Sequence, residues 1–322
     1  MVILQKMLIA RKKISILLRV KLAVCCTLLL LSTSLRAQQE PMYSQYMFNM
    51  LNVNPAYAGN RAVDNISVLY RMQWVNIKGA PTTGTLSWDR RHEGSNVGYG
   101  LQIYNDRLGV ETTTGIQAFY SYRIPFSESF LSFGLSAGVL NYQAAYSQAQ
   151  TTTGGDPLFQ LDVNGILPTI GFGLMYATEK WYLGLSVPAL LNTKINVYNQ
   201  SVATGASNHY FLTGGYIFNP SEVFKLKPSV MVKGVSGAPI ECDFNLNGWI
   251  NDAVGLGVSY RTNDALVGMF ELQISPQLRL GYAYDYLVTN LKTYTKGTHE
   301  LMLRYEFNHD KKSNQILSPR YY

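Results

Sequence analysis

The chain lacks long hydrophobic runs beyond its first few dozen residues. After residue 37, no stretch approaches the roughly 18 consecutive apolar residues that a membrane helix needs. Hydrophobic residues nevertheless make up 47% of the chain, so they are distributed in short pieces. Helical membrane spans are therefore excluded for residues 38–322.

Acidic residues are missing from residues 1–37, which carry seven lysines and arginines. The basic group Arg11, Lys12 and Lys13 precedes an apolar run at 22–31, and Ala37 offers a small residue for cleavage. A basic start, a short apolar run and such a site are typical of a secretory signal peptide. The sequence therefore predicts a signal peptide at 1–37 and export of the remainder.

The predicted exported part also has a single cysteine and no net charge. Cys25 and Cys26 lie in the signal, so Cys242 alone excludes an intramolecular disulfide or a cysteine-based metal cluster. Cys25 follows the bulky Val24, which disfavours lipidation, and Met7 is an alternative start. Seven of the 27 lysines and arginines precede residue 38, leaving 20 against 20 acidic residues. Because the exported chain is neutral, we expect no nucleic-acid partner.

What the chain does have, from residue 65 to residue 307, is alternation. In the first run, Ile66, Val68 and Tyr70 alternate with Ser67 and Arg71, the period of two that is typical of a β-strand. We expect most runs to reach about nine to eleven residues, the length of a tilted strand that crosses a bilayer. The fourteen predicted strands are centred at Val68, Leu86, Leu101, Ala118, Leu135, Phe172, Leu185, Leu212, Val230, Phe244, Leu256, Phe270, Tyr282 and Leu303.

Charged residues within these runs keep to the polar parity, as Arg71, Asp89 and Glu300 do, while the opposite parity is apolar. A membrane barrel has one face toward lipid and the other toward its lumen, which explains the pattern. A soluble β-sandwich buries its apolar face and leaves the polar face in water, so it explains the pattern too. Parity alone leaves both folds open.

The lengths of the connections favour the barrel. Links after even-numbered runs are short, whereas the long polar links 143–165, 189–207 and 287–298 follow odd-numbered runs. Outer-membrane barrels have short turns at one rim and long loops at the other. We therefore predict an all-β fold, an outer-membrane antiparallel β-barrel of about 14 strands with short periplasmic turns and longer extracellular loops. A soluble sandwich remains the weaker alternative.

The predicted organisation is a signal peptide at 1–37, an N-terminal periplasmic or plug segment at 38–63, the barrel at 64–307 and a periplasmic tail at 308–322. Inward charges of both signs suit pairing across the lumen better than an ion-selective pore. In the segment before the barrel, polar and aromatic residues are interleaved, and the turn pair Asn54-Pro55 leads toward the first strand. We expect a plug, or a periplasmic collar whose aromatic residues lie on the lower rim.

The sequence offers little for catalysis. Asp243, Asn245 and Asn247 begin like a calcium loop, but Val254 stands where the bidentate glutamate belongs. Glycine pairs such as 255–257 lack the third glycine and the following helix of a dinucleotide site. The four histidines are scattered. We predict neither an enzyme nor a cofactor or metal site.

Five segments resemble the PorP/SprF family of type IX secretion system membrane proteins. These are "SQYMFNMLNVNPAYAG", "RMQWVNIKGAPTTGTLSWDR", "GYGLQIYNDRLG", "LRLGYAYDYLVTNLKTYTKGTHELMLRYEF" and the ending "SPRYY". The resemblance implies an outer-membrane barrel of Bacteroidota. The motif residues that carry over as partner-binding or barrel-closing are Tyr43, Ser44, Gln45, Tyr46, Phe48, Asn49, Asn54, Pro55, Arg71, Gln73 and Trp74. A structural role in closing the barrel is favoured over partner contact, since polar lumen residues are commonly structural.

The resemblance also implies a function without catalysis in the outer membrane. The barrel would tether a secreted surface protein through its type IX C-terminal domain, or link the secretion and gliding machinery to the outer membrane. Its partners would be that secreted protein, translocon or periplasmic ring components, and outer-membrane lipid. The alternative is a transport barrel, either a porin or a channel for hydrophobic solutes, because fourteen strands enclose a lumen wide enough to conduct.

Overall fold

The computed structural model describes residues 42–61, 63–149, 161–191, 194–197, 200–203, 208–235 and 238–307. In 194–197 and 200–203 it describes the backbone alone. The predicted signal peptide and the tail 308–322 lie outside the described residues.

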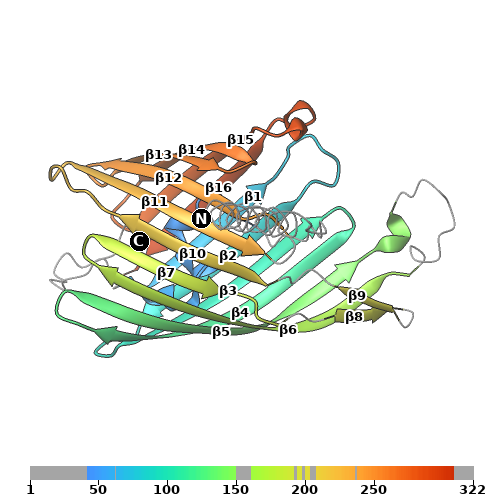
Figure 1. The fold of residues 1–322 in the computed structure, drawn as a ribbon, viewed down its shortest axis with the longest axis horizontal. Coiled ribbons are helices and arrows are strands. Elements are labelled where there is room, and N and C mark those ends of the chain that lie inside the picture. The colour runs from blue at the N-terminus through green and yellow to red at the C-terminus, as the bar shows by residue number, and fades with distance from the viewer. Residues whose placement is uncertain are drawn as a thin grey trace, which may run out of the picture. The chain divides into compact units, whose positions relative to one another are not determined.

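The described strands form a closed antiparallel barrel of fourteen, in which β1 pairs with both β2 and β16 (Figure 1). Each predicted centre lies in one of these strands, so the predicted fold is confirmed. Two further strands, β8 (Lys194–Val197) and β9 (Gln200–Ala203), form a separate small sheet. The barrel strands are β1 (Asn65–Met72), β2 (Thr82–Arg91), β3 (Val97–Leu108), β4 (Glu111–Pro125), β5 (Ser129–Ala144), β6 (Val163–Thr178), β7 (Trp181–Val187), β10 (His209–Tyr216), β11 (Phe224–Val235), β12 (Glu241–Ile250), β13 (Val254–Arg261), β14 (Ala265–Gln273), β15 (Leu278–Leu287) and β16 (Thr298–Glu306).

The two faces of the sheet follow the alternation of the sequence. In β16 the apolar Leu301 and Leu303 are 46% and 44% exposed, whereas Glu300 and Arg304 are buried. The same alternation runs through the other strands, so the outer surface is an apolar band and the charges point inward. An exposed apolar band around a closed sheet is the surface of a barrel that sits in lipid. None of the helices in the described residues is long and apolar enough to cross a membrane.

The connections differ between the two rims. At the short-turn rim the links are brief, as at 126–128, 179–180, 251–253 and 274–277. At the long-loop rim the links 145–162, 188–208 and 288–297 are long, although 109–110 and 262–264 are tight turns there. Because the number of strands is even, β1 begins and β16 ends at the short-turn rim, where Asn65 pairs with Glu306.

Strand length departs from the prediction on one side of the barrel. Strands β4, β5 and β6 have 15, 16 and 16 residues, whereas β1 has 8. Their outward face changes from apolar to polar near the long-loop rim. In the register row of Asn105, Thr114 and Asn141 only Ile166 is apolar, and the next row, Arg107, Thr112, Gln143 and Asn164, is polar throughout. These strands therefore continue past the apolar band at the long-loop rim. The expected nine to eleven residues describe only the part of a strand that lipid surrounds.

Candidate functional site: the plugged lumen

Residues 42–61, called the plug from here on, lie inside the ring of strands and are drawn in blue in Figure 1. The plug contains three short 3-10 helices, η1 (Tyr46–Phe48), η2 (Met50–Asn52) and η3 (Pro55–Tyr57). All residues from 43 to 61 are buried, apart from the half-buried Asn52. Burial of this kind makes the plug part of the core of the protein.

The turn pair Asn54-Pro55 starts η3. The Asn54 side-chain oxygen accepts a hydrogen bond of 2.9 Å from the Ala56 backbone N–H. Proline suits the first helical position because that residue needs no N–H, and asparagine is a preferred cap. The Asn54 amide also donates to the Leu174 carbonyl of β6 at 3.0 Å, so the turn is anchored to the wall.

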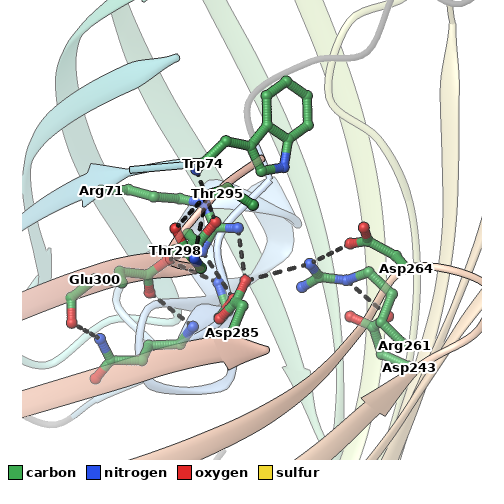
Figure 2. Close-up of polar contacts among 12 residues, drawn as sticks. Arg71, Trp74, Asp243, Arg261, Asp264, Asp285, Thr295, Thr298 and Glu300 are labelled. Atoms are coloured by element: carbon green, nitrogen blue, oxygen red, sulfur yellow. Dashed lines mark hydrogen bonds and ion pairs between the residues drawn. The ribbon is translucent and has the colours of Figure 1, made fainter. Parts of the chain in front are cut away.

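A charged cluster holds the beginning of the plug near the long-loop rim (Figure 2). Arg71 of β1 lies 2.8 Å from Asp285 of β15 and 2.9 Å from Glu300 of β16. Ser44 donates its hydroxyl to Asp285 at 2.7 Å and accepts from Arg71 at 2.8 Å. The backbone N–H groups of Ser44 and Gln45 each donate to a different Glu300 oxygen at 2.8 Å. We call these five residues the long-loop cluster.

Arg261 extends the charged network along the wall (Figure 2). Its guanidinium lies 3.2 Å from Asp243, 3.1 Å from Asp264 and 3.7 Å from Asp285. Asp285 therefore receives contacts from Arg71 and Arg261 at the same time. Buried carboxylates shared between two arginines are costly to leave unpaired, so the network favours one arrangement of these strands and the plug.

The middle of the plug is held by neutral groups. The Asn49 amide donates to Ser67 at 2.9 Å and to Ser87 at 2.7 Å. Asn245 of β12 donates to the Tyr46 hydroxyl at 2.7 Å. These contacts give hydrogen-bond partners to the buried Asn49 amide and to the buried Tyr46 hydroxyl.

A second charged cluster lies near the short-turn rim. Arg61 pairs with Glu306 at 2.6 Å, and both Arg61 and Arg304 donate to the Phe48 carbonyl, at 3.3 and 3.0 Å. Arg304 also contacts Glu271 of β14 at 3.4 Å. The plug is thus attached at both ends of the lumen by buried charge, and its residues run from the long-loop rim to the short-turn rim.

On the opposite wall the plug approaches the strands by their backbone. A Cβ added at Gly134 of β5 would collide with the backbone of Ala56, and one at Gly98 of β3 would collide with the carbonyl of Ala58. Glycine at these inward positions removes the side chain that would hold the plug away. Ser132 donates to the Ala56 carbonyl at 2.8 Å, which fixes the same contact.

The structure brings most of the sequence-predicted site residues together. Nine of them lie in the lumen, namely Tyr43, Ser44, Gln45, Tyr46, Phe48, Asn49, Asn54, Pro55 and Arg71. Gln73 and Trp74 instead lie in the link after β1, where the Gln73 N–H donates to Pro81 and the Trp74 N–H donates to Thr298. The expected collar differs from the structure, because the aromatic residues lie inside the ring and Ser44 reaches the long-loop end.

Sequence reasoning missed the partners that hold the plug. Asp285, Glu300, Arg61 and Glu306 were not assigned to the site, although three of them lie on the inward parity of their strands. Parity shows that a charge points into the lumen. It does not show which of the many inward charges meets which, because that depends on the register and height of each strand.

The comparison with protein families decides the identity. Residues 35–305 match the family described as "Type IX secretion system membrane protein PorP/SprF". The chain belongs to this family. The PorP/SprF protein described here is accordingly an outer-membrane component of type IX secretion.

Solved structures with a similar arrangement are outer-membrane proteins of low sequence identity. CymD, a monoaromatic hydrocarbon channel, is 13% identical with a TM-score of 0.48, over 85% of this chain and 96% of that chain. Omp33 of Acinetobacter baumannii is 8% identical with a TM-score of 0.45, over 77% and 100%. Outer membrane phospholipase A from Escherichia coli is 11% identical with a TM-score of 0.40, over 80% and 100%. No curated protein sequence matches the chain.

Proposed function

We propose that this PorP/SprF protein is a closed docking platform rather than a channel. Its long-loop rim faces the outside of the cell and binds a secreted surface protein. The contact is made by the type IX C-terminal domain of that secreted protein. Its short-turn rim faces the periplasm, where components of the secretion or gliding machinery can reach it. The barrel provides the attachment to the outer membrane and performs no reaction.

The observation that carries this proposal is the filled lumen. Residues 43–61 are almost entirely buried. Hydrogen bonds to the buried carboxylates of Asp285 and Glu300 hold the plug at Ser44 and Gln45, and the buried ion pair with Glu306 holds it at Arg61. Displacing Ser44 from Asp285 and Glu300 would leave two carboxylates with fewer donors in a buried site, which is strongly unfavourable. A lumen that is difficult to open suits a platform better than a conduit for solutes.

The long-loop rim offers the surface that such a partner would need. The link 288–297 contains η6 (Asn290–Thr293) and the 74% exposed Tyr294. In the link 145–162, η4 (Tyr146–Gln148) is tied back by the Ser147 N–H, which donates to Asp162 at 3.0 Å and lowers the pKa of that carboxyl. Exposed loops on a rigid scaffold commonly carry recognition.

Purification of the tagged protein from its native outer membrane in mild detergent tests this function. Mass spectrometry of the purified material should find a secreted protein with a type IX C-terminal domain, or a machinery component, in a stoichiometric amount. The same preparation in planar bilayers should show no conductance. A barrel that is purified alone and conducts ions or solutes would refute the platform and support the transport alternative.

A further inference from the structure

The part of β6 nearest the long-loop rim has a neighbouring strand on one side only. β6 pairs with β5 along its whole length, from Thr178 opposite Ser129 to Val163 opposite Ala144. On its other side β7 is much shorter, and its pairing ends with Phe172 opposite Val187. Within the described residues, the segment 163–171 of β6 therefore has a second edge without a strand beside it.

The direction of the backbone groups at this edge can be read from one hydrogen bond. The Ile170 carbonyl accepts from the Leu190 N–H at 2.7 Å, on the side of β7. Because the N–H and C=O groups of alternate residues in a strand point the same way, Asn164, Ile166 and Pro168 face this side too. Pro168 agrees with that assignment, since a proline facing β5 would interrupt the ladder between them.

Asn164 and Ile166 are the positions where the edge is open. Both are exposed, with Ile166 at 73%, and among the described residues neither has a backbone partner on that side. Pro168 carries no N–H, and the Ile170 carbonyl is occupied by Leu190. An unpaired strand edge is a template for another strand, and natural proteins often protect it with proline or a covering segment. In β6 such protection covers only Pro168 and Ile170, and it does not extend to Asn164 and Ile166.

The open part lies outside the apolar band. Asn164 is in the register row with Arg107, Thr112 and Gln143, which are all polar, and Ile166 is the one apolar residue in the next row, with Asn105, Thr114 and Asn141. One row lower, Pro168 is level with Ile103, Ile116 and Val139, which are apolar. The edge is therefore closed where lipid surrounds the barrel and open just beyond it, at the long-loop rim.

We propose that the edge formed by residues 164–166 of β6 binds an extended strand of the exported protein by β-augmentation. This inference rests on the proposed function and specifies how the partner is held. Two residues with free N–H and C=O groups offer up to four backbone hydrogen bonds, and the exposed Ile166 side chain offers an apolar contact for alternate residues of the added strand.

A second copy of this chain fits the edge less well. Two barrels in the same membrane have the same orientation, so their β6 strands would run parallel, which is the slightly weaker pairing. Pro168 also prevents the contact from continuing down the wall into the membrane. A strand from an exported polypeptide has neither constraint, because it can approach from outside in the antiparallel direction.

Substitution with proline tests the proposal, because proline removes an N–H without disturbing the ladder with β5. The probe is the C-terminal domain that co-purifies with the wild-type barrel, identified and then purified. Ile166→Pro and Asn164→Pro should each weaken its binding to the detergent-solubilised barrel by about tenfold or more. Ile166→Thr and Asn164→Ala keep the N–H, so they should bind within about threefold of wild type. Heat-modifiable migration on gels confirms that each variant barrel is folded.

Hydrogen exchange on the wild-type complex provides a measurement that needs no variant. The amides of Asn164 and Ile166 should become protected when the C-terminal domain binds. If the domain binds but these amides stay unprotected and the proline variants bind as wild type, the edge proposal is overturned and the platform function stands. If no C-terminal domain co-purifies, the edge proposal fails, and if no machinery component co-purifies either, the platform function fails with it. A barrel dimer that Ile166→Pro abolishes would identify a second copy as the occupant and overturn the proposal.

Discussion

On one side of the lumen, strands β12 to β16 and β1 hold the plug mainly with charged side chains, whereas β3 to β7 hold it mainly with small neutral ones. Arg123 of β4, which donates to the Asn60 side chain at 2.7 Å, is the charged exception. The charged side supplies Arg71, Asp285, Glu300, Arg304 and Glu306. The neutral side supplies glycines that admit the plug backbone and serine hydroxyls that donate to its carbonyls. These serine contacts are Ser121 to Ala58, Ser132 to Ala56 and Ser186 to Val53.

The two sides of the lumen constrain the plug in different ways. Small residues set how closely the plug can approach the wall, and they would accept many similar backbones. Buried charges accept only a partner with the right donors at the right place, because an unpaired buried charge is strongly unfavourable. The neutral side therefore determines fit, and the charged side determines which segment fits and in what direction.

Removing the plug should have the largest effect, because it disrupts both sides at once. Deletion of residues 42–60 leaves the long-loop cluster without Ser44 and Gln45 and leaves the inward glycines facing an empty lumen. We expect ion conductance to appear in planar bilayers and the thermal unfolding midpoint to fall further than in any variant below. A deletion variant that stays silent and unfolds at the wild-type temperature would show that the plug does not close the lumen.

Breaking the charged side alone should have the next largest effect. Arg71→Met leaves Asp285 and Glu300 without one of their cations, and should lower the free energy of unfolding by about 3–5 kcal/mol. The triple variant Arg71→Met, Asp285→Asn, Glu300→Gln removes both signs of charge and should recover much of that loss. Denaturant titration followed by tryptophan fluorescence measures both. Equal losses in the two variants would contradict the importance of unpaired charge.

Overfilling the neutral side should cost less. Gly134→Val places a side chain against the backbone of Ala56, and should lower the free energy of unfolding by about 1–3 kcal/mol. Gly268→Ala on the outer face of β14 is the matched control, since a Cβ there meets nothing within 4 Å. Both variants are compared by the midpoint of heat-modifiable migration. A Gly134→Val barrel as stable as the control would mean that the plug moves away from the wall without penalty.

Removing one serine hydroxyl should have the smallest effect. Ser132→Ala deletes the 2.8 Å hydrogen bond to the Ala56 carbonyl, and should lower the free energy of unfolding by about 0.5–1.5 kcal/mol. Ser127→Ala, in the exposed link 126–128, should change it by less than about 0.5 kcal/mol. The same unfolding assay resolves the two. A larger loss for Ser132→Ala than for Arg71→Met would reverse the ranking of the two sides.

Much of the barrel could be predicted from the order of residues. Strand centres, inward charges and the two unequal rims follow from alternation and from where the polar links lie, because a strand has a period of two and lipid accepts only one face. The excess length of β4, β5 and β6 could not be predicted in this way. Beyond the membrane these strands keep the alternation of inward and outward residues, but no lipid selects apolar side chains there. The outer limit of the membrane is therefore marked only by the change from apolar to polar outward residues at Asn105, Thr114 and Asn141.

The plug could be predicted only in part. Its mixture of aromatic and polar residues indicated a buried and hydrogen-bonded segment. Its extent could not be inferred, because the heights of Ser44 and Arg61 in the lumen depend on which wall residues they meet. A collar at the short-turn rim was expected because the sequence does not show these contacts. The structure instead places Ser44 near the long-loop rim.

By itself the sequence determined the fold class, the strand order, the direction of most inward charges and the family, although Arg261 escaped it. These follow from local periodicity and from motifs that are read along the chain. Only the tertiary structure decided that Arg71 meets Asp285, Glu300 and Ser44, that β5 admits the plug backbone at Gly134, and that β6 keeps an open edge at Asn164 and Ile166. Each of these depends on the register between strands far apart in sequence, and register is set by the closure of the whole barrel.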